Sequence, residues 1–496
     1  MREQPELLDQ MLAQAEVCVK ELQPRLGAVV SDKDRNLVEL ERLIFEAVLR
    51  LGAIWLGMVL SLYASHLAEE AGTRLPCSCG GAMRWVSERA KTVLSLLGKV
   101  TYRRVYYHCA GCKRGVALGD RRWGLEHTRT TPGVVQLAAY LAAGRSFVEV
   151  AREICRTLCW PQQWLSGKQV QRLAEPLGSR LGAMQAECVG QWWQMVTAAR
   201  SSEVVTEAEA LIGKAKAGSV EPIRRLYVQM DGIFVRFRGK EGKGSDFWHE
   251  VKVGAVFVAE MGQRVSQIAQ AVGEAAKMQG QVVWPWVDRP QGPISYVAGQ
   301  LGAAEFGIRL YAEAVRRGLE RAEEVVILGD GARWIWELAE EHFRGAVQIL
   351  DFWHASERVW KVAHAVWGEG SAHAKRWAEE QITEHLIKGD AEGLIEAIQA
   401  LPAVPPLPGQ SRSIPDQAAE YFRNNAGRMR YPEYRARGME IGSGTVESAG
   451  KRVVGQRCKG PGMRWSEDGL PAILDLRTHV LNERYDLALA ALPKVA

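Results

Sequence analysis

The sequence lacks the marks of a secreted or membrane-embedded protein. Residues 1–6 are acidic and helical in character, so they do not predict a signal peptide. Residues 51–67 hold no Asp, Glu, Lys or Arg, but 17 residues is borderline short for a membrane span. Ser61, Ser65 and His66 also lie inside this stretch. A buried or dimer-forming helix is the better interpretation, and we expect a cytoplasmic protein.

A disulfide framework is also missing. The nine cysteines are odd in number, and four of them cluster between residues 77 and 112. That pattern indicates metal ligation in a reducing cytosol, not the paired cysteines of a secreted domain. The sequence shows no internal repeat. Its 47% hydrophobic content and 17 Trp favour a globular protein over a disordered one.

Neither sign of charge is in large excess over the whole chain. The net charge is +5, from 63 basic and 58 acidic residues, and it argues only weakly for an anionic partner. Residues 82–122, however, carry ten Lys or Arg against two Asp or Glu, and residues 423–464 carry ten against three. Such blocks suit the phosphate backbone of nucleic acid, although either one alone could equally be a solvated charged surface.

Strand-like and helix-like patterns alternate in the second half of the chain. Their order, β-β-β-α-β-α-β-α, is that of an RNase H-like fold. A connector with five prolines at 401–415 interrupts the mostly helical stretch that follows. The expected strands are 224–238, 248–260, a third that includes 294–297, 324–328 and 346–353, and the expected helices are 303–317, 332–342 and one from about 355.

A chain of 496 residues is too long for one ordinary domain. We predict a multidomain α+β protein. An RNase H-like α/β catalytic domain carries an all-helical insertion and follows helical and zinc-ribbon-like DNA-binding segments. The predicted segments are an N-terminal helical region at 1–75, a candidate for dimerisation; a zinc-ribbon-like segment at 76–125; a helical, helix-turn-helix-like segment at 126–215; the first part of the catalytic domain at 216–360; the helical insertion at 361–440; and the last part of the catalytic domain with a C-terminal helix at 441–496.

Two of the expected strands run into an Asp-Gly pair, at Asp231 and Asp330, and a third acid, Glu447, follows later. In an RNase H-like sheet the first strand is central and the fourth lies beside it, so Asp231 and Asp330 would be neighbours. A helix crossing that edge would supply Glu447. Three such carboxylates can hold two Mg²⁺ (or Mn²⁺) ions about 3.5–4 Å apart, which activate a nucleophile and stabilise a leaving oxyanion in phosphodiester chemistry.

Each of these acids has a plainer interpretation when taken alone. Asp-Gly after an apolar run is a common turn signal, and a strand-to-helix turn would suffice for Asp330. Glu447 could be a first-turn acid favoured by the helix dipole, or an i,i+4 partner of Lys451. Taken together with the order of the elements, the three acids favour catalysis.

Four motifs resemble those of one protein family. They are Met230-Asp231-Gly232; Gly329-Asp330-Gly331-Ala332 with Trp334; Ile349-Leu-Asp351-Phe-Trp-His354; and Gly442-Ser-Gly-Thr-Val-Glu447-Ser, followed by Lys459-Gly-Pro-Gly-Met-Arg-Trp465. From about residue 70 to its C-terminus, the chain resembles the bacterial insertion-sequence transposases of the ISKra type, a DDE group related to Mutator-like transposases. The resemblance implies that Asp231, Asp330 and Glu447 form a DDE triad.

Asp351 and His354 are candidate auxiliary residues. Their spacing is similar to an acidic-or-Cys-x-x-His motif that Mutator-like transposases carry after their second Asp. Asp351 could tune a metal-bound water or orient His354, which could contact phosphate or donate a proton. Asp351 could equally be the N-cap of the helix that begins near Ala355.

The cysteines of Cys77-Ser-Cys79 and Cys109-Ala-Gly-Cys112 could bring four thiolates to a structural Zn²⁺. The segment resembles the zinc ribbon that related transposases have here, but Cys-x-Cys stands where Cys-x-x-Cys is usual. Three outcomes stay open: the geometry adapts, His108 replaces one thiolate, or the site has decayed.

Residues 144–178 resemble a helix-turn-helix in which Ser166 caps a second helix, 167–176. Helix pairs joined by turns also occur without DNA, so this pattern alone decides nothing. Further basic residues surround Glu447, where a solvated basic face is the alternative. The predicted DNA contacts are Arg103, Arg104, Lys168, Gln169, Arg172, Lys451, Arg452, Arg457, Lys459 and Arg464.

These observations predict a nucleoid-associated transposase that binds the terminal inverted repeats of an insertion sequence, cleaves DNA and transfers the strands. Its partners are double-stranded DNA, at transposon ends and target, and further copies of itself, because two ends must be paired. Two alternatives remain. One is a domesticated or inactive DNA-binding protein that keeps the fold, and the other is an RNase H-like nuclease without strand transfer.

Overall fold

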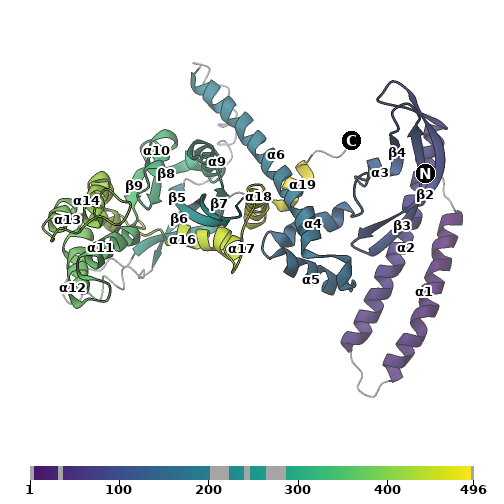
Figure 1. The fold of residues 1–496 in the computed structure, drawn as a ribbon, viewed down its shortest axis with the longest axis horizontal. Helices are drawn as coiled ribbons and strands as arrows, with labels where there is room; N and C mark the ends of the chain where they lie inside the picture. The colour runs from purple at the N-terminus through teal and green to yellow at the C-terminus, as the bar shows by residue number, and fades with distance from the viewer. Residues whose placement is uncertain (1–4, 32–36, 202–222, 240–245, 264–285, 493–496) are drawn as a thin grey trace. The chain divides into compact units, whose positions relative to one another are not determined.

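The computed structural model describes residues 5–31, 37–201, 223–239, 246–263 and 286–492 (Figure 1). The chain divides into two compact units. One comprises Met1–Leu181 with Asp486–Ala496, and the other comprises Gly182–Tyr485. Part of the expected helical segment, 202–215, lies outside the described residues.

The first unit begins with two long helices, α1 (Pro5–Ser31) and α2 (Leu37–Ala71), which run beside one another (Figure 1). α2 also packs closely on strand β3 (Gly98–Cys109). A Cβ at Gly57 would lie 2.5 Å from the carbonyl oxygen of Thr101, so this contact requires glycine. The backbone N–H of Arg103 donates to Ser61 Oγ across the same contact, at 2.9 Å.

α2 does not match the expectation of a buried helix. Within it, Leu43, Ala53, Gly57 and Ala64 are buried, but only 17% of its most apolar window is. Among the described helices it alone is long and apolar enough to cross a membrane, by length and composition only. α2 buries little because α1 and β3 cover only part of it. The expectation of a buried helix is wrong here, and the alternative of a dimer-forming helix stays a prediction.

A four-stranded antiparallel sheet follows α2. Its strands, in spatial order, are β1 (Arg74–Pro76), β2 (Ala82–Ser95), β3 and β4 (Gly115–Ala117). Gly98, at a φ of +111°, begins the return strand of the β2–β3 hairpin. A small core joins this hairpin to α2, and it contains Ala53, Val93, Val100, Tyr102 and Leu125.

Four further helices include the expected helix pair: α3 (Leu118–Arg122), α4 (Pro132–Ala142), α5 (Phe147–Thr157) and α6 (Gly167–Ser201), with a short 3-10 turn at Gln162–Trp164. The predicted end of the second helix at Pro176 is wrong, because α6 continues past it. A proline inside a helix costs about 3 kcal/mol, because it removes one backbone hydrogen bond and its ring clashes with the preceding turn. The apolar stripe of Val170, Ala174, Leu177 and Leu181 stays buried through that turn and offsets this cost.

A mixed five-stranded sheet forms the centre of the second unit. Its order is β7 (Trp286–Gly299), β6 (Phe247–Gln263), β5 (Ile223–Phe237), β8 (Ala322–Gly329) and β9 (Val347–Leu350). β5, β6 and β7 are antiparallel neighbours, whereas β8 and β9 run parallel to β5. The first strand, β5, is therefore central, with the fourth beside it.

Helices cover both faces of this sheet (Figure 1). A Cβ at Gly254 would meet Leu310 of α9, and one at Gly450 of α16 would meet Ile233 on the opposite face. The bounds of this unit's helices are α9 (Ala303–Arg316), α10 (Arg333–His342), α11 (Phe352–Trp367), α12 (Ala372–Gln381), α13 (Ala391–Gln399), α14 (Ile414–Asn425), α15 (Tyr431–Ala436), α16 (Gly444–Gly450), α17 (Gln456–Cys458) and α18 (Gly469–Leu481), with short π or 3-10 turns at Leu319–Arg321, Ile382–Leu386, Ala426–Arg428 and Lys451–Gly455. The last helix, α19 (Tyr485–Ala491), belongs to the first unit from Asp486 onward.

One core runs from this sheet into the helical stretch. It joins Val228 and Ile327 of the sheet to Val359, Leu394 and Phe422 of the helices. The expected strands and helices are confirmed in kind, and α13 ends before the proline-rich connector as expected. β9 is shorter than predicted because Asp351 already caps α11. The predicted domain boundary at 360/361 falls inside α11, which runs to Trp367.

Candidate active site and candidate metal site

Two acids lie next to each other where β8 ends against β5. The last pair of the parallel ladder is Met230 with Gly329. Asp231 and Asp330 directly follow these two residues. Neighbouring strands are about 4.8 Å apart, which keeps the two acids close. Burial, together with the charge of Asp330, raises the pKa of Asp231 to about 6. A divalent cation between the carboxylates would relieve that repulsion.

The backbone around both acids is firmly held. The N–H of Gly232 donates to Asp231 Oδ1 at 2.7 Å, and the N–H of Ala332 donates to Asp330 Oδ1 at 2.9 Å. β5 continues past Gly232 to Phe237, so Asp231 is not in a hairpin turn. Tyr421 packs against Gly331, which has a φ of +94°, and its hydroxyl donates to the Asp330 carbonyl at 2.7 Å.

The third acid, Glu447, lies on α16, which docks directly on β5. The buried side chain of Gln229 makes this contact: its Oε1 accepts from the N–H of Val446 at 2.9 Å. Gln229 and Asp231 point to the same face of the strand because they are two residues apart. At the other end of α16, a Cβ on Gly450 would lie 4.0 Å from Asp231 Oδ2. Helix α16 therefore crosses the strand at the position of Asp231.

The Glu447 carboxylate itself faces solvent. It accepts from Lys451 Nζ at 2.6 Å, the i,i+4 pairing that the sequence left open, and 55% of its side chain is exposed. In the part of the chain that the structure describes, only a group of four cysteines brings three or more potential ligand atoms within 4.8 Å of one another. The described structure therefore does not bring Asp231, Asp330 and Glu447 within 4.8 Å of one another, and a divalent cation held by the three acids stays a prediction.

Asp351 is the N-cap of α11 and also contacts His354, while its auxiliary role stays a prediction. Its Oδ1 accepts from the N–H of Trp353 at 2.7 Å, as a helix N-cap, and its Oδ2 lies 2.7 Å from His354 Nδ1. This hydrogen bond is the main cause that raises the pKa of His354 to about 9. Since Asp231 and Asp330 add to that shift, His354 is a cation facing the acids at neutral pH.

Three residues of this site were not predicted from the sequence: Gln229, Tyr421 and Ser443. Ser443 Oγ donates to Asp351 Oδ2, and it thereby ties the start of α16 to the start of α11. Gln229 could have been found by its position two residues before Asp231, on the same face. Tyr421 carries no local signal, because its partner lies 91 residues away.

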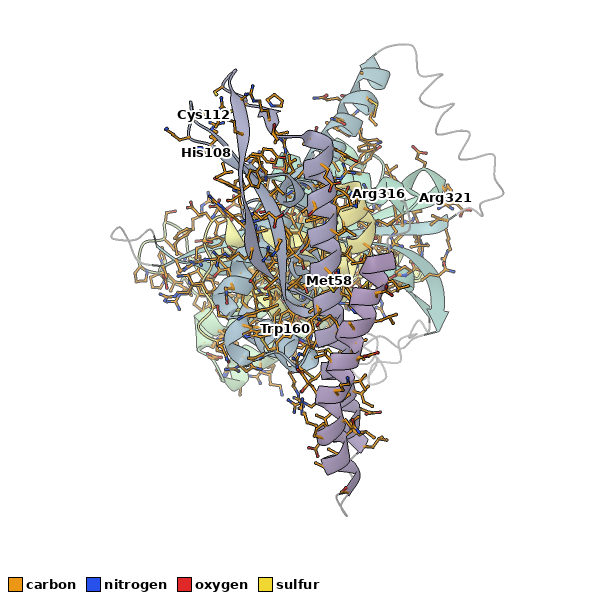
Figure 2. The ribbon with its side chains drawn as sticks, turned by 90° about the vertical axis from the view of Figure 1, so that its right-hand side faces the viewer. Met58, His108, Cys112, Trp160, Arg316 and Arg321 are labelled. Carbon is orange, nitrogen blue, oxygen red and sulfur yellow. The ribbon has the colours of Figure 1, made fainter. Side chains whose placement is uncertain are left out.

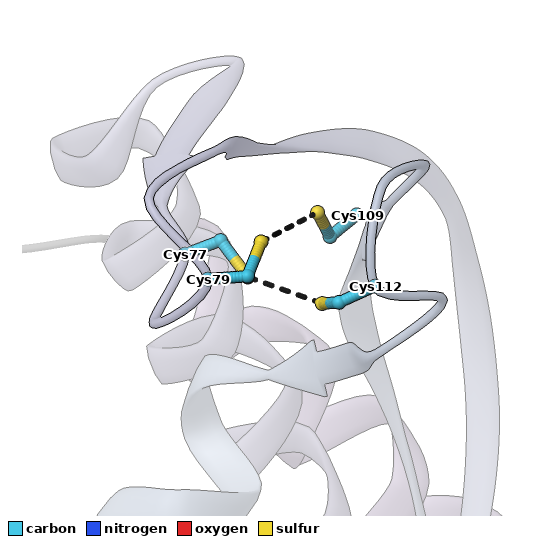
Figure 3. Close-up of side chains that lie close together, drawn as sticks. All are labelled: Cys77, Cys79, Cys109 and Cys112. Atoms are coloured by element: carbon cyan, nitrogen blue, oxygen red, sulfur yellow. Dashed lines mark hydrogen bonds between the residues drawn. The ribbon is translucent and has the colours of Figure 1, made fainter.

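The four clustered cysteines meet at one end of the first unit's sheet (Figures 2 and 3). The sulfur atoms of Cys77 and Cys112, and of Cys77 and Cys79, are 3.4 Å apart, and those of Cys79 and Cys109 are 3.7 Å apart. Tetrahedral zinc at about 2.3 Å from each sulfur would place them about 3.8 Å apart. The spacing fits a zinc ion despite the Cys-x-Cys pair, and His108 is not part of the ligand group.

The surroundings act on these thiols unequally. The N–H of Cys112, joined by that of Gly111, lowers the pKa of Cys109 to about 6. Although the N–H of Cys79 lowers it, burial and hydrogen bonds with the other thiols raise the pKa of Cys77 to about 12. A bound cation would favour the thiolate form of all four, because metal binding requires deprotonated thiols. Gly81 leaves room for the sulfurs, since a Cβ there would already lie 3.5 Å from Cys79 Sγ.

Some predicted DNA contacts of the first unit are engaged with buried groups or caps, and others stay exposed, of which Arg103 lies 3.4 Å from Glu88. The guanidinium of Arg104 pairs with the buried carboxylate of Asp120. Arg104 is therefore removed from the predicted DNA contacts. The Gln169 side chain is also bound, because its Oε1 accepts from the N–H of Ser166 at 2.7 Å in a reciprocal cap. Arg103, Lys168 and Arg172 remain exposed.

A similar division holds near Glu447. Arg457 is wrong as a DNA contact, because it is 2% exposed and its guanidinium lies 5.0 Å from the centre of the Trp465 ring. Arg452 is exposed and lies over the Tyr296 ring at 5.7 Å. Lys451, Lys459 and Arg464 are exposed, although Lys451 is paired with Glu447 and Arg464 lies 3.4 Å from Asp246.

Comparisons with known proteins give a family match and structural similarities. A family described as an uncharacterised protein family (UPF0236) matches residues 311–485, a stretch that contains Asp330, Asp351, His354 and Glu447 but not Asp231. No curated protein matches the chain. Among solved structures, the chain is similar at 10% identity to one described as the Drosophila P element transposase strand transfer complex. That match covers 54% of this chain and 66% of the other, just under two thirds, and its TM-score of 0.18 is too low to indicate a shared fold.

Proposed function

We propose that this protein is a DDE transposase of the ISKra type, related to Mutator-like transposases, with an RNase H-like catalytic domain. The observation that carries the proposal is the pair Asp231 and Asp330 on adjacent parallel strands, with the pKa of Asp231 raised to about 6 and α16 docked beside them. A central first strand flanked by antiparallel second and parallel fourth strands supports the RNase H-like assignment.

In this proposal Asp231, Asp330 and Glu447 hold two Mg²⁺ ions. When bound, the ions supply an activated hydroxyl nucleophile and stabilise the leaving oxygen of a phosphodiester. To reach the metal ions, Glu447 would leave its ion pair with Lys451. An exposed pair of this kind contributes only about 0.5 kcal/mol, so it is easily broken. His354, held by Asp351 in its cationic form, donates to a phosphate oxygen of the DNA.

The first unit binds DNA and carries a structural Zn²⁺ at Cys77, Cys79, Cys109 and Cys112. The proposed segments are those expected from the sequence, with 1–75 pairing two copies of the chain and 126–215 reading transposon ends. Exposed cations remain for phosphate contacts. They are Arg103, Lys168, Arg172, Lys451, Arg452, Lys459 and Arg464.

Metal-dependent nicking tests the proposal. The wild type should nick DNA that carries the inverted repeats found beside its gene, with Mg²⁺ or Mn²⁺ present, and Asp231→Ala should lose at least a hundredfold in rate. Equal DNA binding by both proteins with cleavage by neither would instead identify an inactive DNA-binding protein.

Strand transfer separates a transposase from a plain nuclease. Precut ends with free 3′-hydroxyls should be joined to a target plasmid by the wild type and not by Asp231→Ala. Nicking of the repeats without any joined product would assign the chain to RNase H-like nucleases.

A further inference from the structure

The ladder of β5 and β6 continues past Asp231, as far as the pair of Phe237 and Phe247. Past Met230, β5 has β6 as its only ladder partner among the described residues, apart from one bridge between Phe237 and Trp465. One face of this extension carries four side chains: Phe234 opposite Glu250, and Arg236 opposite Trp248. We call these four residues the ribbon face.

Two large aromatic side chains of the ribbon face are open to solvent. Phe234 is 56% exposed and Trp248 is 60% exposed. In the printed register they are diagonal neighbours, at about 7–8 Å between backbones, so their rings can form one surface. Scattered apolar side chains are normal on a protein surface, but adjoining aromatics next to charged residues mark a site of contact.

The charges around the ribbon face favour an anionic partner. Arg236 and Arg464 share one carboxylate, Asp246, at 3.0 and 3.4 Å. Glu250 is matched by Lys252 at 2.9 Å, and the exposed Arg238 has no ion pair within the described residues. Four cations thus stand against two carboxylates, which leaves a surplus of two positive charges.

The ribbon face also lies within reach of the candidate catalytic acids. Phe234 follows Asp231 by three residues, about 10 Å along a strand, and its side chain points to the opposite face of β5, so a DNA strand that reaches both must cross the edge of β5. Stacked DNA rises about 3.4 Å per nucleotide, so this path takes at least about three nucleotides. Because β8 has ended at Gly329, no strand of the described sheet blocks the edge of β5 between the acids and Phe234.

We propose that the ribbon face stacks unpaired DNA bases within a few nucleotides of the phosphodiester that the acids cut. The inference rests on the proposed function and names the part of the DNA that this surface holds. Bases inside a duplex have both π-faces covered, so only unpaired or extruded nucleotides can use Phe234 and Trp248. Stacking tolerates any base, whereas the surplus cations contact the phosphates between them.

Binding of DNA labelled with 2-aminopurine tests the inference. The full chain with Asp330→Asn, which blocks cleavage, is titrated with a mixed-sequence duplex that has a short single-stranded 3′ overhang and the fluorescent base in that overhang. Stacking should quench the fluorescence. Phe234→Ala combined with Trp248→Ala should remove the quenching and weaken overhang binding roughly tenfold or more, with blunt-duplex binding unchanged.

Two further variants separate stacking from loss of structure. Trp248→Phe keeps an aromatic ring and should retain most of the quenching. Phe247→Ala removes an aromatic from the opposite face, where Phe247 stacks on Phe237 at 5.5 Å, so it loosens the ribbon but should leave the quenching intact.

Three outcomes would overturn the inference. One is quenching that survives the double alanine variant, and another is equal loss in Phe247→Ala. The third is a change of oligomeric state in the double variant with DNA binding unchanged, which would assign the ribbon face to a second copy of the chain. Nicking by the wild type is scored separately, so a failed transposase proposal and a failed ribbon proposal give different results.

Discussion

At the scale of single residues, buried polar groups decide where the candidate catalytic acids lie. Gln229 is fully buried, and its amide both accepts from Val446 and donates to Glu440 Oε2 at 3.2 Å. A buried polar group left without a partner costs about 1–3 kcal/mol, so this amide strongly favours one position of α16 on β5. The acid pair and α16 are thus arranged by a residue that has no chemical role of its own.

Asp475 of α18 provides a pH-dependent prediction at the same scale. Burial raises its pKa to about 7, although Arg309 lies 3.7 Å away, and an unfolded Asp titrates near 3.9. The folded state therefore binds this proton more tightly, so stability is lost as pH rises from about 4 through 7. Asp475→Asn should raise the free energy of unfolding at pH 8 by roughly 2–4 kcal/mol, and by less at pH 5.

Urea unfolding of both proteins at the two pH values measures this difference. A gain of the same size at pH 5 and pH 8, or a loss at pH 8, would contradict the assignment of the proton to Asp475.

At the scale of elements, the β1–β4 sheet depends on the turns that carry its cysteines. Cys77 and Cys79 lie in the turn between β1 and β2, and Cys109 and Cys112 lie at the turn between β3 and β4. Outside the cysteine cluster, the core beneath this sheet is small. Small cores are commonly reinforced by a structural metal.

Zinc removal is the prediction for this element. The wild type should contain about one zinc per chain, and Cys79→Ser should lose most of it together with a lower melting temperature. Cys188→Ser, which changes an exposed cysteine outside the cluster, should keep both. Elemental analysis and thermal unfolding measure the two effects. A full zinc complement in Cys79→Ser would refute this ligand set.

At the scale of the whole molecule, the N-terminal helices leave apolar surface uncovered. Leu8 and Leu12 of α1 are 60% and 54% exposed, and Val48 of α2 is 60% exposed. We predict that a second copy of the chain covers this surface, as the proposed pairing of two DNA ends would require. The length and composition of α2 leave a membrane as the competing partner.

Changing Val48 separates these partners. Val48→Glu places a charge in the contact, so the protein should shift from dimer to monomer in light scattering, at least tenfold in dissociation constant. Val86→Glu on β2, where the valine is 45% exposed, should leave the mass unchanged. Unchanged dimers in Val48→Glu would remove this face from the interface, and binding of the wild type to lipid vesicles would favour the membrane.

The order of the strands and helices, the acids in β5 and directly after β8, and the clustering of the cysteines could be predicted from the sequence. These features depend on periodicity, turn chemistry and spacing within a few residues. Contacts between distant segments could not. Arg104 and Arg457 look like free cations in the sequence, yet Arg104 pairs with the buried Asp120 and Arg457 is buried against Trp465. Likewise Pro176 remains inside α6, because burial depends on which surfaces meet. For Glu447 the sequence offered both a pair with Lys451 and a place among the acids, and the structure has the pair.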